Sequence, residues 1–168
     1  MTLTVRPFVL VLVMFGAIAA PVAQSRPDAA KLKQQLIGSY QLISYIQIDQ
    51  NGVERKTNHV AGQITYDAAG RMSAQLMPGG RVPLPTGGAA TDAQRAAAAA
   101  GYVAYFGRYE IDAERGVVTH IVEGSLSQTM LGQAMPRYFE LSPDGQSLYL
   151  TTKNGDRVTG RLRWDRYR

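Results

Sequence analysis

The chain lacks cysteine and contains only two histidines among its 168 residues. Without cysteine it can form neither a disulfide framework nor a lipid-modified N-terminal cysteine, so the fold depends on its core alone. The two histidines, His59 and His120, are far apart in sequence and give no metal-ligand spacing, so no metal site is predicted. A phosphate-binding glycine loop, a dinucleotide fingerprint and a nucleophile elbow are missing too, so no cofactor is expected.

Charge is also sparse, because only 18% of the residues are charged and the formal net charge is +5. The basic residues are scattered except in the C-terminal segment GRLRWDRYR, 160–168. There Arg161 and Arg163 alternate with Leu162 and Trp164, which is the pattern of a strand with one solvated face. No nucleic-acid partner is therefore expected.

A long apolar run lies near the N-terminus, from Phe8 to Ala20, behind the positive charge of Arg6. It is shorter than the roughly 20 residues that a membrane-spanning helix needs. Small residues follow it, as at a signal-peptidase site. We therefore expect residues 1–25 to be a secretory signal peptide and residues 26–168 to form one periplasmic or secreted domain, with no membrane span after cleavage.

Five glycine-containing turns separate short segments rich in Val, Ile, Tyr, Leu and Thr. The turns are DQNG, DAAG, AERG, SPDG and KNGD, at 49–52, 67–70, 113–116, 142–145 and 153–156. This is a repeated hairpin signal. Eight strands are predicted, at 39–48, 61–66, 71–77, 106–112, 117–123, 136–141, 148–152 and 158–166. Many short sequential strands indicate an all-β protein, either a barrel or a sandwich.

One helix is predicted between the third and fourth strands. Thr91 and Gln94 form a capping box, and an alanine run with high helix propensity follows them. The preceding stretch, 77–90, contains several prolines and glycines and is predicted to be a long loop, of the kind that often forms a lid. A shorter amphipathic helix is expected around 28–36.

The hairpin around AERG has one register that keeps charge off its apolar face. In that register Tyr109 pairs with His120, and both side chains point inward. Glu123 then lies on the outer face near Arg108, although it is only three residues from His120. His120 is a buried polar residue that needs a hydrogen-bond partner.

The same alternation places several polar side chains among the inward-facing ones. Arg137 shares a face with Phe139, and an inward arginine needs an acidic partner, the mouth of a barrel or a ligand. The candidate ligand-binding residues are Tyr66, Met72, Tyr109, His120, Arg137 and Phe139, with Tyr40 and Ser44 as further inward positions.

The ordered set of segments resembles the lipocalin-like domain family, a group of calycin-type small β-barrels. The matching stretches are LIGSYQLISY, GQITYDAAGRMSAQLM, GYVAYFGRYEIDAERGVVTHIVEGSL, PRYFELSPDGQSLYLTT and VTGRLRWDR. The family usually has Gly-x-Trp in the first stretch, and Tyr40 stands in place of that tryptophan. The resemblance implies a small barrel that can hold an apolar ligand, but it implies little about any reaction.

We therefore predict an eight-stranded antiparallel up-and-down β-barrel with one inserted α-helix. The 77–90 loop and the 124–135 segment, which contains Leu126, Met130, Leu131 and Met135, are expected to frame its mouth. The leading hypothesis is a binder of a small apolar or amphipathic ligand, whose carboxylate or carbonyl end meets the polar candidates.

Two other functions are consistent with the sequence. Tyr109 and His120 are candidate catalytic residues, an acid and a base, of an isomerase or cyclase. Alternatively, the barrel is filled and acts as a protein-interaction module through an apolar patch that includes Ile43 and Tyr45, which alternate outward from the predicted first strand.

Overall fold

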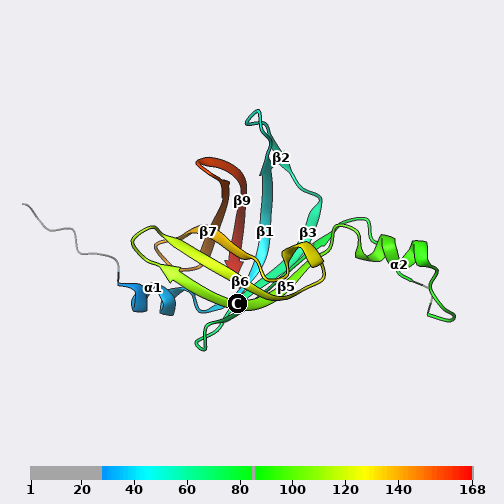
Figure 1. The fold of residues 1–168 in the computed structure, drawn as a ribbon, viewed down its shortest axis with the longest axis horizontal. Helices are drawn as coiled ribbons and strands as arrows, with labels where there is room; N and C mark the ends of the chain where they lie inside the picture. The colour runs from blue at the N-terminus through cyan, green and yellow to red at the C-terminus, as the bar shows by residue number, and fades with distance from the viewer. Residues whose placement is uncertain (1–27, 85, 168) are drawn as a thin grey trace, which may run out of the picture.

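The computed structural model describes residues 28–84 and 86–167 (Figure 1), so the predicted signal peptide lies outside the described residues. The elements in chain order are α1 (Ala29–Leu36), β1 (Gly38–Ile48), β2 (Glu54–Lys56), β3 (His59–Tyr66), β4 (Arg71–Pro78), α2 (Asp92–Ala99), β5 (Val103–Asp112), β6 (Val117–Ser125), the 3₁₀ helix η1 (Gln128–Met130), β7 (Ala134–Leu141), β8 (Ser147–Asn154) and β9 (Arg157–Arg166).

The strands form a closed antiparallel barrel. Each strand from β3 to β8 pairs with the next along the chain, β1 pairs with β3, and β1 pairs with β9 to close the sheet. The short strand β2 adds only to the far end of β1, where Ile48 pairs with Glu54. The predicted eight-stranded up-and-down barrel is thus confirmed, and each of the eight predicted strands has its counterpart. The sequence did not reveal β2 or η1.

The glycine turns form as predicted, because each contains a glycine with positive φ. Gly70, at φ 84°, and Gly116, at φ 61°, are examples in which another residue would be strained. The register of the hairpin between β5 and β6 also agrees with the prediction, since Tyr109 pairs with His120 and Asp112 with Val117. The hydrophobic pattern was sufficient here because a slip would have buried charges.

One end of the barrel is closed by α1 and by Arg166, at the end of β9. The Arg166 guanidinium donates hydrogen bonds to the carbonyl oxygens of Ile37, Gln35 and Gly145, at 2.8, 2.5 and 2.8 Å. It also lies 4.7 Å from the centre of the Tyr40 ring. These contacts give Tyr40 a barrel-closing role.

Gly38 makes room for this arrangement at the closed end. A Cβ atom at position 38 would lie 2.1 Å from Nη1 of Arg166, which is held in place by its carbonyl partners. Tyr40 itself is fully buried, and its hydroxyl donates to the carbonyl of Leu36 at 2.9 Å. The Gly-Ser-Tyr segment therefore packs the base of the barrel against α1.

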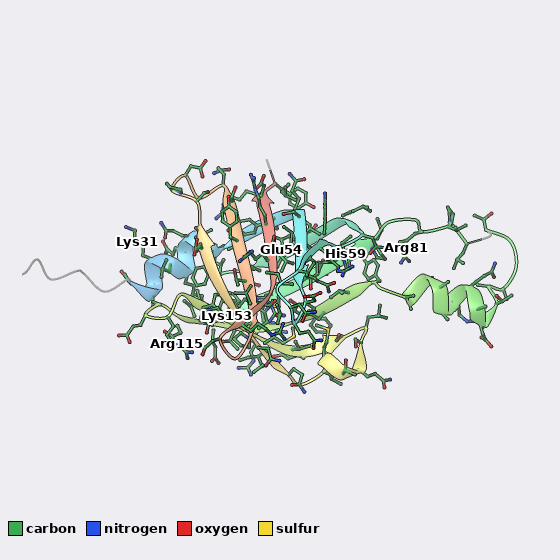
Figure 2. The ribbon with its side chains drawn as sticks, turned by 90° about the horizontal axis from the view of Figure 1, so that it is seen from above. Lys31, Glu54, His59, Arg81, Arg115 and Lys153 are labelled. Atoms are coloured by element: carbon green, nitrogen blue, oxygen red, sulfur yellow. The ribbon has the colours of Figure 1, made fainter. Side chains whose placement is uncertain are left out.

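The other end, which we call the mouth, is surrounded by the connections β1–β3, β4–β5, β6–β7 and β8–β9. The β4–β5 connection, 79–102, contains α2 and projects away from the barrel as an arm (Figures 1 and 2). The predicted capping box of Thr91 and Gln94 is present. The 77–90 loop leaves the barrel at the mouth, which it was expected to frame, but it then runs outward beside α2 and does not lie across the mouth as lid loops do (Figure 1).

A bulge in β1 changes which of its side chains face inward. The pairing of β1 with β9 shifts between Leu42 and Ser44, so Ile43 is the extra residue and is 43% exposed. After the bulge, Tyr45 pairs with the buried Leu162 and packs against the core. The predicted outward position of Tyr45 and the predicted inward position of Ser44 are therefore both wrong, because strict alternation cannot anticipate an extra residue.

Candidate ligand-binding site

His120 lies in the middle of the barrel between two tyrosines. It is fully buried on β6, and its Nε2 atom is 2.7 Å from the Tyr66 hydroxyl on β3. Its Nδ1 atom is 2.9 Å from the Tyr105 hydroxyl on β5. The buried polar residue thus has a partner on each ring nitrogen, which satisfies the requirement that the sequence raised. We call Tyr66, His120 and Tyr105 the buried relay.

The imidazole of His120 is neutral at physiological pH. Burial, together with the nearby positive charge of Arg137, lowers the pKa of His120 to about 3. A neutral imidazole has one nitrogen that donates and one that accepts, so one tyrosine of the buried relay donates a hydrogen bond to the ring and the other accepts one from it. Burial raises the pKa of Tyr66 and of Tyr105, so both remain protonated phenols.

Arg137 faces inward from β7, as the alternation predicted, since it pairs with the fully buried Val118. Its guanidinium lies close enough to Tyr105 to oppose the rise in that tyrosine's pKa, both by its charge and by hydrogen bonding. Its Nη1 atom donates to the neighbouring carbonyl of Pro136 at 2.9 Å, and Nη2 lies 3.6 Å from Sδ of Met135. Within residues 28–84 and 86–167, no carboxylate forms an ion pair with Arg137.

Tyr109 is buried as predicted, but its hydroxyl lies at the closed end of the barrel. It donates to the carbonyl of Asp67 at 2.7 Å, and its ring meets the Tyr66 ring edge-on with centroids 5.1 Å apart. Tyr109 and His120 are therefore strand neighbours that share no hydrogen bond.

Glu123 is a surface carboxylate, as predicted. It bonds Arg108 at 2.9 Å and also Arg71 at 2.7 Å, and these hydrogen bonds lower its pKa. It takes no part in the buried relay.

Met72 and Phe139, the two apolar candidates, are members of the core, with 4% and 7% of their surface exposed. They fill the barrel together with Val118, Leu148 and Trp164. The half of the barrel next to the closed end, which we call the lower barrel, is therefore packed with side chains.

The mouth half is lined by residues that are only partly buried. Tyr45, Val103, Met130 and Met135 pack against the core from this end while keeping some exposure. The segment with Met130 and Met135 was expected to frame the mouth, and these two residues do reach the core there. Flexible methionines around an inward arginine make an adaptable apolar surface.

Tyr105 and Tyr45 were absent from the predicted site. The predicted fourth strand began at Phe106, but β5 begins at Val103. Stepping back by two residues from Tyr109 through Gly107 leads to Tyr105, so alternation along a longer strand would have found it. Tyr45 was missed because of the bulge at Ile43.

The surface carries hollows outside the barrel. One, of about 470 Å³, lies between α2 and the loop before it. Another, of about 430 Å³, lies on the outer face of β1, β3 and β4 and is lined by Gln41, Gln63, Gln75 and Tyr102 among others. Neither includes a residue of the buried relay.

The described residues hold no group of three His, Cys, Asp or Glu side chains able to bind a metal. No helix among the residues drawn in colour in Figure 1 is long and apolar enough to cross a membrane.

Comparison with known proteins places the chain in a family by sequence. No curated protein matches it. Among solved structures, a redesigned β-barrel matches with a TM-score of 0.42 and 8% identity, over 81% of this chain and 95% of that one. A family model described as a lipocalin-like domain matches residues 37–167, which is the whole barrel. The chain therefore belongs to the lipocalin-like domain family.

Proposed function

We propose that the mouth half of the barrel binds a small, mostly apolar ligand whose carboxylate or carbonyl end meets Arg137 and Tyr105. Membership of the lipocalin-like family supports ligand binding in general terms. The observation that carries the finer proposal is Arg137, an inward-facing arginine with no carboxylate partner among the described residues. A charged group in such a place is costly unless something pairs with it.

Apolar affinity would come from the partly buried Tyr45, Val103, Met130 and Met135. Covering such side chains contributes about 25 cal/mol for each Å² removed from water. The lower barrel is filled, so the ligand is expected to be short or to leave its tail at the mouth. An acidic head would gain charge-assisted hydrogen bonds from the guanidinium.

The test begins with native mass spectrometry of the protein produced in a bacterial periplasm, compared with its denatured mass. A co-purifying small molecule would identify the ligand class directly. Binding of dodecanoic acid and of methyl dodecanoate is then compared in Arg137→Ala. We expect the variant to lose roughly tenfold or more in affinity for the acid and much less for the ester.

The matched control is Arg115→Ala, in which the arginine removed lies on the exposed β5–β6 turn, away from the mouth (Figure 2). This variant should bind both probes as the wild type does. Equal losses for acid and ester in Arg137→Ala would contradict the proposed polar contact, and failure of the wild type to bind either probe would contradict lumen binding.

The geometry of Tyr109 and His120 supports ligand binding more than proton transfer between these two residues. Tyr109 donates to a backbone carbonyl and not to His120. With a pKa of about 3, His120 would be a weak general base near neutral pH, where catalysis favours a matched pKa. The hypothesis of a protein-interaction patch loses support as well. Of the two residues named for that patch, Tyr45 faces the core and Ile43 is exposed.

We also propose that the protein acts in the periplasm or outside the cell, on the strength of the apolar N-terminal run behind Arg6. Cell fractionation with N-terminal sequencing of the mature protein tests this. A cytoplasmic product that retains residues 1–25 would contradict it.

A further inference from the structure

We infer that Tyr105 and Arg137 offer only hydrogen-bond donors to the lumen, so that the site selects a head group that only accepts, such as a carboxylate, over one that must donate. This inference rests on the proposed function, since it concerns the same site. It names Tyr105 as a residue that determines specificity. The placement of hydrogen atoms along the buried relay determines which donors face the ligand.

Tyr66 lies at the end of the buried relay nearest the closed end of the barrel. It is 1% exposed, and its hydroxyl lies 2.7 Å from Nε2 of His120. If Nε2 carried a hydrogen, the Tyr66 hydroxyl would accept it, and its own proton would have no partner in a site closed to water. A buried unsatisfied donor is expensive. Tyr66 therefore donates to an unprotonated Nε2.

The other ring nitrogen of His120, Nδ1, carries the hydrogen, because the imidazole is neutral and Nε2 accepts. Nδ1 lies 2.9 Å from the Tyr105 hydroxyl, so it donates to that oxygen. Tyr105 is thus the acceptor in this bond.

The Tyr105 oxygen is hydrogen-bonded by two groups, the Nδ1–H of His120 and the Arg137 guanidinium, and both are donors. The Tyr45 hydroxyl, from the lining of the mouth half, is also near enough to raise the pKa of Tyr105. The O–H of Tyr105 must therefore point away from both donors, and Tyr105 retains 7% exposure beside the partly buried lining of the mouth half. Together with the N–H groups of Arg137 that do not bond the Pro136 carbonyl, the Tyr105 hydroxyl gives the ligand donors from both side chains.

The tautomer can be measured without a ligand, and His59 provides an internal reference. Its Nε2 atom lies 3.1 Å from the carbonyl oxygen of Gly101, which can only accept, so His59 carries its hydrogen on Nε2. The two histidines of the chain are thus expected to be opposite tautomers. Long-range ¹⁵N–¹H NMR at neutral pH distinguishes them, and His59→Gln assigns the signals. An Nε2-protonated His120 would overturn the inference.

Ligand selection is tested with three probes that share an alkyl chain: dodecanoic acid, methyl dodecanoate and dodecylamine. Each displaces the uncharged fluorescent reporter N-phenylnaphthylamine from the full-length protein. We expect the acid to displace it best, the ester less well, and the amine, which has only donors when charged, least. An amine that competes as well as the acid would overturn the inference, while the proposed lumen binding would stand.

The matched pair of variants is Tyr105→Phe and Tyr149→Phe, because Tyr149 lies on the outer face of β8 and is 40% exposed. Tyr105→Phe should weaken the acid roughly tenfold and narrow its advantage over the ester, whereas Tyr149→Phe should change neither. If neither the reporter nor any probe binds, the proposed function fails, and the NMR tautomer still decides how the donors are arranged. An unchanged acid preference in Tyr105→Phe would remove Tyr105 from the site.

Discussion

The two inward arginines of this barrel, Arg166 at the closed end and Arg137 in the mouth half, differ in how fully they are satisfied. Arg166 gives hydrogen bonds to three carbonyl oxygens and stacks on Tyr40. Arg137 bonds the carbonyl of its own neighbour, Pro136, and keeps other donors near Tyr105. The difference shows how a structural arginine can be told from a functional one: Arg166 has an acceptor for each of its three nitrogens, whereas Arg137 has one carbonyl acceptor and donors left over.

The largest effect is expected for Arg166→Ala. The change removes all three hydrogen bonds to carbonyls and the cover over Tyr40, so those acceptors are left without a charged donor. We expect a loss of about 3 kcal/mol in the free energy of unfolding, measured by urea denaturation. The protein that remains folded should still bind dodecanoic acid. A variant as stable as the wild type would break the contrast between the two arginines.

The next effect is the pH dependence caused by His120. Its pKa is about 3 in the folded protein, against 6.5 for an unperturbed histidine, so the unfolded chain binds the extra proton as the pH falls below 6.5. The contribution of neutral His120 to the free energy of unfolding is therefore fully present above pH 6.5. Below pH 6.5 the free energy of unfolding falls by about 1.4 kcal/mol per pH unit, until the pH reaches the folded pKa. Urea denaturation at pH 7 and pH 5 measures this slope. His120→Gln should remove this pH dependence, and His59→Gln should keep it. Loss of the pH dependence in His59→Gln would contradict the prediction.

A smaller effect is expected for Tyr109→Phe, which deletes the hydrogen bond to the carbonyl of Asp67 at the closed end. Stability should fall by about 1 kcal/mol, while displacement of the reporter by dodecanoic acid should not change. Tyr105→Phe, by contrast, should lower the affinity for dodecanoic acid. If Tyr109→Phe weakens acid binding as much, the closed end is not separate from the site.

The smallest effect on stability is expected for Arg137→Ala. Its guanidinium has no ion-pair partner in the described part of the chain, so removing it should change the free energy of unfolding by only about 0.5 kcal/mol. A small gain is equally consistent, because an unpaired charge leaves the barrel. Urea denaturation without ligand measures this. A loss comparable to that of Arg166→Ala would make Arg137 structural.

Much of the fold could be predicted because local signals agreed with one another. The glycine turns marked the hairpins, and charges on one face of the β5–β6 hairpin permitted only one register, which placed His120 inside. The inward direction of Arg137 followed from the same alternation. Each of these inferences used residues close together in sequence.

The remainder depended on contacts between distant segments or on single irregular residues. His120 bonds Tyr66 and Tyr105, not its strand neighbour Tyr109, because side chains from several strands meet inside a barrel. The bulge at Ile43 left no sequence signal, since both faces of β1 carry apolar residues, and it turned Tyr45 inward. The direction of the 79–102 arm depends on how β4 and β5 end, and composition does not reveal that.

The arm also has a consequence for protein engineering. β4 and β5 are paired from Arg71 with Arg108 to Leu76 with Val103, so the ladder is complete before the chain leaves the barrel. At its base, the arm is joined to the barrel by the hydrogen bond from Gly79 N–H to the Asn58 carbonyl and by that between His59 and Gly101. Val82, farther out, is 84% exposed. The tip of the arm is thus where new chain termini, an affinity tag or a reporter domain could be placed while the barrel keeps all its strand pairs.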